Sequence, residues 1–221
     1  MKPALPWALL AASLCGSVDA QEAKRHVTQA TIQGKRVTVE YGRAELKGRS
    51  LESLIAQLPD DRVWRAGADE VTTLTTEADL WLDSLSGLAC TRNRRPGKRT
   101  KVAPGKYSLY VSAPLEGDWS LILNSDPGIE LGALGRVMGF PVPPGAEGRL
   151  WPHLEGYNWN RSHGVAGIAE LEVARIVMKP GRADAPVDPF KINLESSGSA
   201  AVTLTLAWAD RTWSADLNGA R

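Results

Sequence analysis

Apolar and polar residues alternate along most of the chain, which is the pattern of β-strands with one buried and one solvated face. In "VTVEY" (37–41), Val37, Val39 and Tyr41 fall on one face, and "VTLTLAW" (202–208) repeats the pattern. The other segments of this kind are "YSLYV" (107–111), "WSLIL" (119–123), "FKINLE" (190–195) and "WSADL" (213–217). Such strands are typical of antiparallel sheets that pack on a core with one face only.

The connections between these segments also favour antiparallel pairing. The tripeptides "QGK" (33–35) and "ADR" (209–211) are short enough to close hairpins. "IAELEVARIVM" (168–178) predicts a further strand, with a bulge between Val173 and Ile176, where the alternation slips. Only "SLESLIAQL" (50–58) has helical spacing, with Ser50 as its candidate N-cap.

About nine strands and one short helix predict an all-β fold, a mostly antiparallel β-sandwich with a jelly-roll-like layout. Two segments interrupt the alternation: a basic stretch at 91–101 and a Gly/Pro-rich loop at 125–167. Loops as long as the one at 125–167 are uncommon in compact domains and tend to be functional or disordered. Neither a repeat nor a domain linker is visible, so we predict a single domain over residues 21–221.

The first twenty residues have the composition of a signal peptide. Lys2 precedes the apolar run "ALPWALLAASL" (4–14), and "VDA" (18–20) offers a cleavage site before Gln21. A helix of that run rises about 16 Å, well short of the roughly 30 Å of a bilayer core. A lipoprotein site would have a small residue where Leu14 precedes Cys15, which disfavours lipidation there. We expect an exported protein, periplasmic or extracellular, with no transmembrane segment.

The net charge and the cysteine content bear on the class of protein and on its disulfides. The formal net charge is +1, which argues against a nucleic-acid-binding protein because such proteins carry a strong basic excess. Cleavage would leave Cys90 as a single cysteine, so no intramolecular disulfide is expected, and a buried or inert thiol is favoured over an intermolecular link. The oligomeric state stays open.

The stretch "DRVWRAGADEV" (61–71) is the first candidate site. Asp69 and Glu70 could act together on a ligand only if Gly67 opens a turn, because neighbours on a strand point to opposite faces. In the structural alternative, Trp64 fills the core, Arg65 pairs with Glu70, and Asp69 bonds a nearby backbone N–H. The residues alone favour the structural reading and leave ligand binding open.

Two further groups are candidate ligand contacts. Arg43, Lys47, Arg49 and Arg65 lie close in sequence, and arginine forks suit carboxylate or phosphate groups; ordinary surface charges are the alternative. "LWPHLEGYNWNRSHG" (150–164) gathers aromatic, amide and histidine side chains, which stack on sugar rings or pin a loop to the sandwich. The candidate contacts in that loop are Trp151, His153 and Trp159.

Motifs that carry catalysis or bind cofactors do not occur. The chain has no G-x-S-x-G, P-loop or dinucleotide fingerprint, and its histidines form no HxH or HExxH pattern. We therefore predict neither a metal nor a cofactor.

Several blocks resemble one bacterial family, the domain-of-unknown-function family 2911 (DUF2911). They are "YGRAELKGR" (41–49), "VWRAGADEVTTL" (63–74), "VAPGKYSLYVSAP" (102–114), "WSLILN" (119–124) and the C-terminal "PFKINLE…LTLAW". The resemblance implies an exported, β-rich domain and supplies no reaction. Ala44 stands where the family usually has proline, and Asp69 where it usually has asparagine.

Three functions follow as hypotheses. The first is a non-catalytic module that binds a polar or anionic ligand, such as a glycan, at the Trp64–Glu70 block and the Trp151–His163 loop. The second is a hydrolase in which Glu70 or Asp69 is the general base and His153 or His163 assists. The third is a structural or envelope-assembly protein without a small-molecule site.

Overall fold

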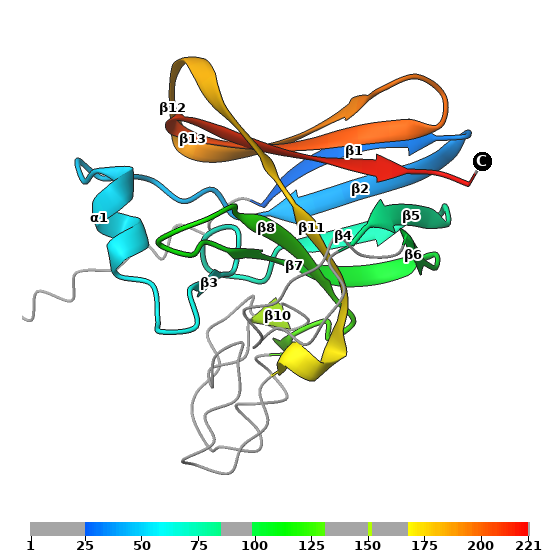
Figure 1. Cartoon of the computed structure of the whole chain (residues 1–221), viewed down its shortest axis with the longest axis horizontal. Helices are drawn as coiled ribbons and strands as arrows, with labels where there is room; N and C mark the ends of the chain where they lie inside the picture. The colour runs from blue at the N-terminus through cyan, green and yellow to red at the C-terminus, as the bar shows by residue number, and fades with distance from the viewer. Residues whose placement is uncertain (1–24, 85–98, 131–149, 152–167, 221) are drawn as a thin grey trace, which may run out of the picture.

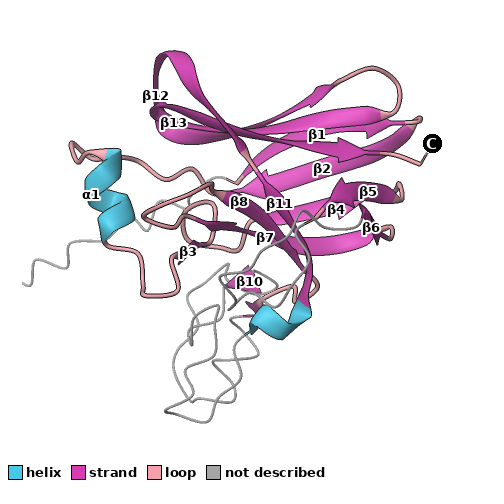
Figure 2. Cartoon of the chain, in the orientation of Figure 1, coloured by secondary structure: helices cyan, strands magenta, loops and turns pink. Residues whose placement is uncertain are grey.

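The computed structural model describes residues 25–84, 99–130, 150–151 and 168–220. Figures 1 and 2 show a molecule built almost entirely from strands, so the all-β class is confirmed. The predicted signal peptide, Cys15, Cys90, His153 and Trp159 lie outside the described residues. No helix within the described ranges is long and apolar enough to cross a membrane.

The first sheet is antiparallel and has the order β1-β2-β4-β7-β8-β11, with β3 paired to the far end of β7. Its strands are β1 (His26–Ile32), β2 (Lys35–Tyr41), β3 (Val63–Trp64), β4 (Thr73–Thr76), β7 (Gly105–Ser112), β8 (Ser120–Asn124) and β11 (Glu172–Val177). Gln33 and Gly34 have φ of 53° and 76°, so the predicted β1–β2 hairpin closes with a two-residue turn of the type that matches strand twist.

The second sheet has the order β12-β13-β5-β6. Its strands are β5 (Leu80–Asp83), β6 (Arg99–Val102), β12 (Lys179–Ser196) and β13 (Ala201–Asn218). Only Met178 separates β11 from β12, so one stretch of chain leaves the first sheet and enters the second. A β-bridge between Ser84 and Ile176 ties the sheets together at that crossing. Strands β9 (Ile129–Glu130) and β10 (Leu150–Trp151) pair with each other in a separate two-stranded sheet.

Strand β13 doubles back on itself. The hydroxyl of Thr203 lies 3.0 Å from a carboxylate oxygen of Asp216, whereas thirteen extended residues would separate them by about 43 Å. The reversal lies at Ala209, which has φ 53°, so the hairpin predicted at 209–211 is confirmed. β12 bends with it, because Arg182 pairs with Arg211 and Val187 with Ala209 across the same reversal. Figure 1 shows the two nested hairpins above the first sheet.

The core lies between the two sheets and contains the apolar faces that the alternation predicts. One continuous cluster holds Val37, Val39 and Leu109 from the first sheet and Leu204 and Leu206 from the second, all with no exposed surface. The predicted β-sandwich is therefore confirmed. Burying one leucine or valine side chain stabilises the fold by roughly 1.5–3 kcal/mol.

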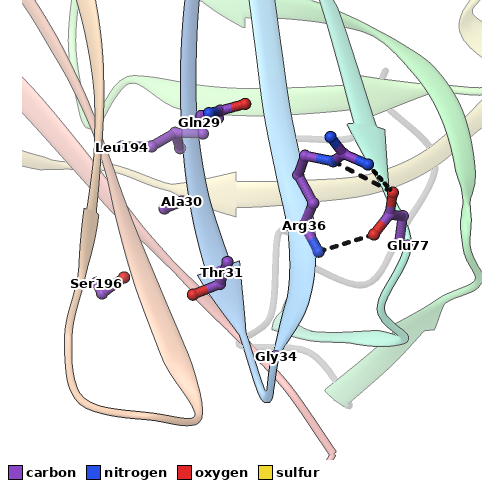
Figure 3. A pocket seen from close by; sticks show the side chains of 8 residues that line it. All are labelled: Gln29, Ala30, Thr31, Gly34, Arg36, Glu77, Leu194 and Ser196. Carbon is purple, nitrogen blue, oxygen red and sulfur yellow. Dashed lines mark hydrogen bonds and ion pairs between the residues drawn. The ribbon is translucent and has the colours of Figure 1, made fainter.

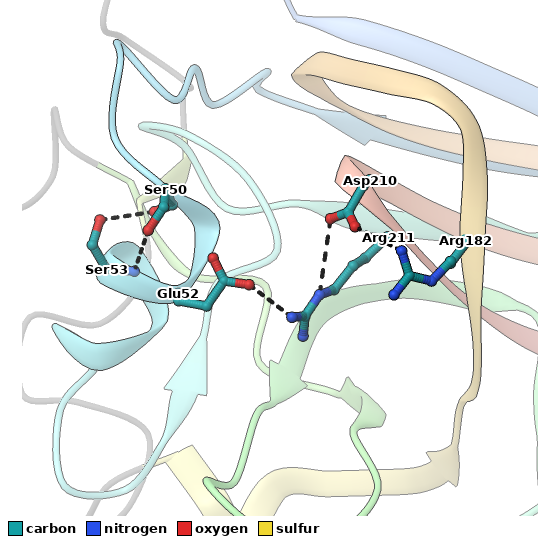
Figure 4. Close-up of polar contacts among 6 residues, drawn as sticks. All are labelled: Ser50, Glu52, Ser53, Arg182, Asp210 and Arg211. Carbon is teal, nitrogen blue, oxygen red and sulfur yellow. Dashed lines mark hydrogen bonds and ion pairs between the residues drawn. The ribbon is translucent and has the colours of Figure 1, made fainter.

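Helix α1 (Leu51–Ala56) begins at the predicted cap. The Ser50 hydroxyl accepts a hydrogen bond from the Ser53 backbone N–H, and Leu51 is buried. The helix is also tied to the tip of the nested hairpins, where Arg211 donates to Glu52 at 2.7 Å (Figure 4). Arg182 and Asp210 form a further ion pair at that tip, at 3.3 Å.

Three details differ from the prediction. Residues Ile168–Leu171 form a 3₁₀ turn, η1, rather than the start of a strand. The bulge in the following strand lies between Glu172 and Ala174, close to the expected position. Strands β4, β5 and β6 were not predicted, because each has four residues, too few for a clear alternation.

The segment after β3 forms a tight loop that packs on Gly42. The Ala68 N–H donates to the Gly42 carbonyl oxygen at 3.1 Å, and Ala66 and Asp69 have φ of 54° and 57°. A Cβ atom at Gly42 would overlap the backbone carbonyl oxygen of Ala68. The loop and the end of β2 therefore approach closely only because residue 42 lacks a side chain.

We predict that Gly42→Ala destabilises the protein by about 3 kcal/mol, since a backbone segment has to move. Gly198→Ala is the control: Gly198 has φ 80° but no atom within 4 Å of a Cβ, so it should cost only about 1 kcal/mol. Urea unfolding measures both. Equal losses would contradict close packing at Gly42.

Candidate functional site

Trp64 belongs to the core. Its ring stacks on Trp208 with centroids 5.2 Å apart and meets Phe190 edge-on at 4.8 Å. Trp208 and Phe190 come from the second sheet and are 5% and 0% exposed. The structural role predicted for Trp64 is confirmed.

The ion pair predicted between Arg65 and Glu70 is wrong. Glu70 is buried and faces Arg25, with Oε2 of Glu70 3.7 Å from Nη1 of Arg25. Nη2 of Arg25 also donates to the Glu40 and Val71 carbonyl oxygens, both at 2.9 Å. Arg65 is exposed and has no hydrogen bond to any described residue.

Asp69 is exposed, and the hydrogen bond expected from its side chain to a local N–H does not form among the described residues. Its φ of 57° belongs to the left-handed region, which asparagine and aspartate tolerate better than most residues. The two adjacent carboxylates therefore do not form a catalytic pair: Glu70 is held in the interior by Arg25, and Asp69 faces solvent.

Of the four basic candidate contacts, Arg43 and Arg49 donate to backbone carbonyl oxygens. Arg43 donates through Nε and Nη2 to the Phe190 and Pro189 carbonyl oxygens, both at 3.2 Å. Arg49 Nε donates to Leu46 O within its own turn at 3.1 Å, and Lys47 is exposed with φ 51°. Two of the four guanidinium or ammonium groups are thus already bonded, and a role for Arg43, Lys47, Arg49 and Arg65 as ligand contacts stays a prediction.

Among the described residues, the loop at 150–164 contacts the stretch 61–71 at one backbone hydrogen bond. The Val71 N–H donates to the Leu150 carbonyl oxygen at 2.9 Å. Beside this contact, Val71, Tyr110 and Ile122 form a second buried cluster on the outer face of the first sheet, with Leu150 packed against it. Burial and the nearby Asp126 charge raise the pKa of Tyr110 to about 12. The side chain of Trp151 and all of His153 and Trp159 lie outside the described residues, so their predicted role stays a prediction.

Glu70→Gln should destabilise the protein by about 2 kcal/mol or more, because it removes a buried carboxylate and leaves the half-buried Arg25 charge without this counter-ion. The neighbouring Asp69→Asn is the matched control and should change the free energy of unfolding by less than about 0.5 kcal/mol. Chemical denaturation of the two variants measures the difference. Equal values would mean that the ion pair contributes nothing.

An open hollow of polar character lies on the outer face of the second sheet. Strand β13 changes neighbour there: Ser214 pairs with Lys179 of β12, and Asn218 pairs with Trp81 of β5. Between these two positions β5 and β12 diverge and leave a groove of about 610 Å³. We call it the split-sheet groove; its lining residues are Asp83, Arg99, Ile176, Val177, Lys179, Ser214, Ala215, Asp216 and Asn218.

The four charged residues of the split-sheet groove form two ion pairs. Lys179 Nζ lies 2.9 Å from Asp216 Oδ2, and Arg99 Nε lies 3.6 Å from Asp83 Oδ1. The hydrogen bond from Lys179, and then that from Thr203, lower the pKa of Asp216 below its usual value. The same contact with Asp216 raises the pKa of Lys179. Both groups therefore stay charged at neutral pH.

An aromatic side chain, that of Trp81, lies across the sheet from Asn218, one of the residues that line the groove. Trp81 alternates with Leu80 and Leu82, which are fully buried, so it points to the outer face together with Asp83. It is half-buried, and its direct partners across the sheet are Asn218 and Lys101. Directly paired residues share a face, so Trp81 stands beside Asn218 on the face that carries the groove.

A second groove lies between the β1–β2 hairpin and β12, with a volume of about 510 Å³ (Figure 3). Its two charged residues, Arg36 and Glu77, bind each other through three hydrogen bonds of 2.8–3.2 Å. These bonds lower the pKa of Glu77. It has two charged lining residues, whereas the split-sheet groove has four, so it offers a ligand fewer charged hydrogen-bonding groups.

Within the described ranges, no three histidine, cysteine, aspartate or glutamate side chains converge as metal ligands do. Asp83 and Asp216 line the same groove, but each is bonded to a basic residue. The described residues thus provide hydrogen-bonding groups and fixed charges rather than a ligand set for a cation.

The split-sheet groove was not anticipated from the sequence. The signal that could have identified Trp81 is the tetrapeptide "LWLD" (80–83), in which a tryptophan takes the polar phase of the alternation. The partners of Trp81 could not be found in this way, because Asn218 is 137 positions away along the chain.

The fold and the groove define an all-β sandwich with an open polar site on a sheet face. The family model described as "Protein of unknown function (DUF2911)" matches residues 23–86, and so confirms the family resemblance over that range. The match includes β1 to β5 and the Trp64–Glu70 block. Comparisons with curated proteins and with solved structures gave no match.

The pKa of the Asp216 carboxyl, followed by carbon-detected NMR, should lie below its usual value of 3.8. Thr203→Val should raise it by removing one hydrogen bond to the carboxylate, and Lys179→Met should raise it more, because Lys179 is the larger cause. Lys191→Met removes an exposed lysine with no bond to Asp216 and should leave the pKa unchanged. Shifts of similar size in Lys179→Met and Lys191→Met would refute the specific contact.

Proposed function

We propose that this protein is an exported, non-catalytic binding module whose ligand site is the split-sheet groove. The observation that carries the proposal is the divergence of β5 and β12 from β13, which leaves a hollow lined by four charged residues, two other polar residues and three apolar ones. Two of the apolar lining residues, Ile176 and Ala215, are 6% and 3% exposed. Concave sites with a few convergent polar groups are where proteins usually bind small molecules.

The electrostatics of the groove favour binding over catalysis. A general acid or base needs a pKa near the working pH, whereas the bond between Lys179 and Asp216 moves both pKa values away from neutrality. The alternative hydrolase would use Glu70 or Asp69, but Glu70 is buried against Arg25. Fixed charges and hydroxyls that keep one protonation state are suited to recognising a ligand.

Export rests on the N-terminal sequence. The positive start at Lys2, the apolar run at 4–14 and the small residues before Gln21 are the three parts of a secretory signal. A binding module with this leader would meet its ligand in the periplasm or outside the cell. A structural or envelope-assembly role remains the rival function, and it requires no small-molecule ligand in the groove.

The proposal is tested by filling the groove. Ser214 is half-exposed and lines it, so the side chain of Ser214→Tyr would occupy the ligand volume. The matched control is Thr75→Tyr, at an exposed position on β4 of the other sheet. Each protein is titrated with oligosaccharides, amino acids and short peptides, and binding is followed through backbone amide shifts in NMR spectra.

We expect at least one of these probes to shift the amides of residues 214–218 in the wild type and in Thr75→Tyr, but not in Ser214→Tyr. Loss of binding by about tenfold or more is expected, because a tyrosine ring excludes the ligand sterically. No binding to the wild type by any probe, or equal binding to Ser214→Tyr, would remove the groove as the site and favour the structural role.

A further inference from the structure

The geometry points to a neutral oligosaccharide as the ligand class of the split-sheet groove, with one sugar ring stacked on Trp81 and the next hydrogen-bonded in the groove. This inference rests on the proposed function and names the ligand of the same site. It combines three independent features of the described residues: an outward tryptophan, a balanced set of charges, and a row of hydrogen-bonding groups of both kinds.

Trp81 is the first feature. The outer face of an antiparallel sheet is normally polar, and the residues around Trp81 on this face are polar, with Lys101 and Asn218 as its direct neighbours. A half-buried indole in that setting leaves apolar surface exposed to water. A sugar ring has an apolar C–H face of matching flatness, and covering the indole with it removes that surface from water.

The charge balance of the groove is the second feature. Asp83 and Asp216 contribute two negative charges, and Arg99 and Lys179 contribute two positive ones. Each acid is paired with one base, at 3.6 Å and 2.9 Å. An anionic or cationic ligand would meet no net opposite charge and would lose its own hydration, which is costly. A neutral ligand meets no such penalty, so the anionic ligand considered from the sequence is not favoured here.

The hydrogen-bonding groups are the third feature. The carboxylates of Asp83 and Asp216 accept, the guanidinium of Arg99 and the ammonium of Lys179 donate, and Ser214 and Asn218 can do both. Sugar hydroxyls both donate and accept, so they match a surface on which acceptors and donors alternate. Asp216 is held by hydrogen bonds from Lys179 at 2.9 Å and from Thr203 at 3.0 Å, which lowers the entropy lost when a ligand binds to it.

The positions of Trp81 and Asp83 along β5 define the order of the two sugar subsites. Trp81 stands opposite Asn218, and Asp83 follows two residues later on the same face of β5. Two residues along a strand span about 6.8 Å. A ring on Trp81 therefore continues along β5 toward Asp83 and Arg99, which are partners across the β5–β6 pair, so the ligand has at least two sugar units.

The experiment uses four neutral oligosaccharides as probes, the hexamers of cellulose, xylan, amylose and chitin, and one anionic probe, hexagalacturonate. Calorimetry and NMR are carried out on the wild type, Trp81→Phe and Trp81→Thr. Threonine is chosen because it favours strands, which keeps β5 intact. The control is Val27→Thr, which removes an apolar side chain 61% exposed on β1, away from the groove.

We expect at least one neutral hexamer to bind the wild type and to shift the indole N–H of Trp81 and the side-chain amide of Asn218. Trp81→Thr should weaken this binding about tenfold, which corresponds to loss of one aromatic stacking contact. Trp81→Phe, which keeps a smaller ring, should fall between the wild type and Trp81→Thr. Val27→Thr should bind as the wild type does.

Failure of the inference is distinguishable from failure of the proposed function. A polar probe whose binding is abolished by Ser214→Tyr but unchanged in Trp81→Thr would leave the groove as the site and overturn the sugar assignment. Binding of hexagalacturonate in preference to all neutral hexamers would overturn the neutral ligand class. No binding by any of the four neutral hexamers overturns the inference, and binding that neither Ser214→Tyr nor Trp81→Thr affects overturns both.

Discussion

The hydrogen bonding of β13 is the constraint on which the second sheet depends. After the reversal at Ala209, the second half of β13 has one edge whose backbone N–H and C=O groups need partners from other strands. β12 supplies them as far as Ser214, and β5 supplies them at Asn218. Because two strands from distant parts of the chain share one edge, they cannot lie side by side along all of it. The groove is the space left where they diverge.

The same constraint explains how the two sheets are held together. β11 belongs to the first sheet, and its continuation β12 belongs to the second, so the chain crosses between layers with only Met178 in between. Met178 is 1% exposed, and its N–H donates to the Trp119 carbonyl oxygen at 2.9 Å. On the inner side, Trp119 stacks on Trp213 with centroids 4.2 Å apart. The crossing is therefore fixed by backbone bonding and aromatic packing at one place.

The alternation of apolar and polar residues was sufficient to predict the strands whose inward-facing residues are all aliphatic or aromatic. Such residues can be buried only between the two sheets, so they mark the inner face of the strand. The alternation failed for β4, where Thr73 and Thr76 are polar and yet 2% exposed. The Thr76 hydroxyl donates to the Ala78 carbonyl oxygen at 2.8 Å, so it satisfies its polar group locally, which no hydropathy pattern reveals. The partner of Glu70 was missed for a related reason: Arg65 is near in sequence, whereas Arg25 is near only after β2 is in place. The split-sheet groove could not be predicted because its lining residues are mostly polar and come from strands that are far apart in sequence and become neighbours only in the folded sheet.

The turn of the first hairpin is bonded to the last residues of the chain. The Gln33 N–H donates to the Ser199 carbonyl oxygen at 2.7 Å, the Gln33 side chain donates to the Ala220 carbonyl oxygen, and the Gly219 N–H donates to Ala200. Contacts between sequence-distant residues slow folding, because long loops have to close before any bond compensates for the lost entropy. A ribosome that still holds residues 199–220 would keep this closure from forming. The turn between β1 and β2 therefore takes its final bonds only after the chain has been synthesised as far as Ala220, which is 187 positions beyond Gln33.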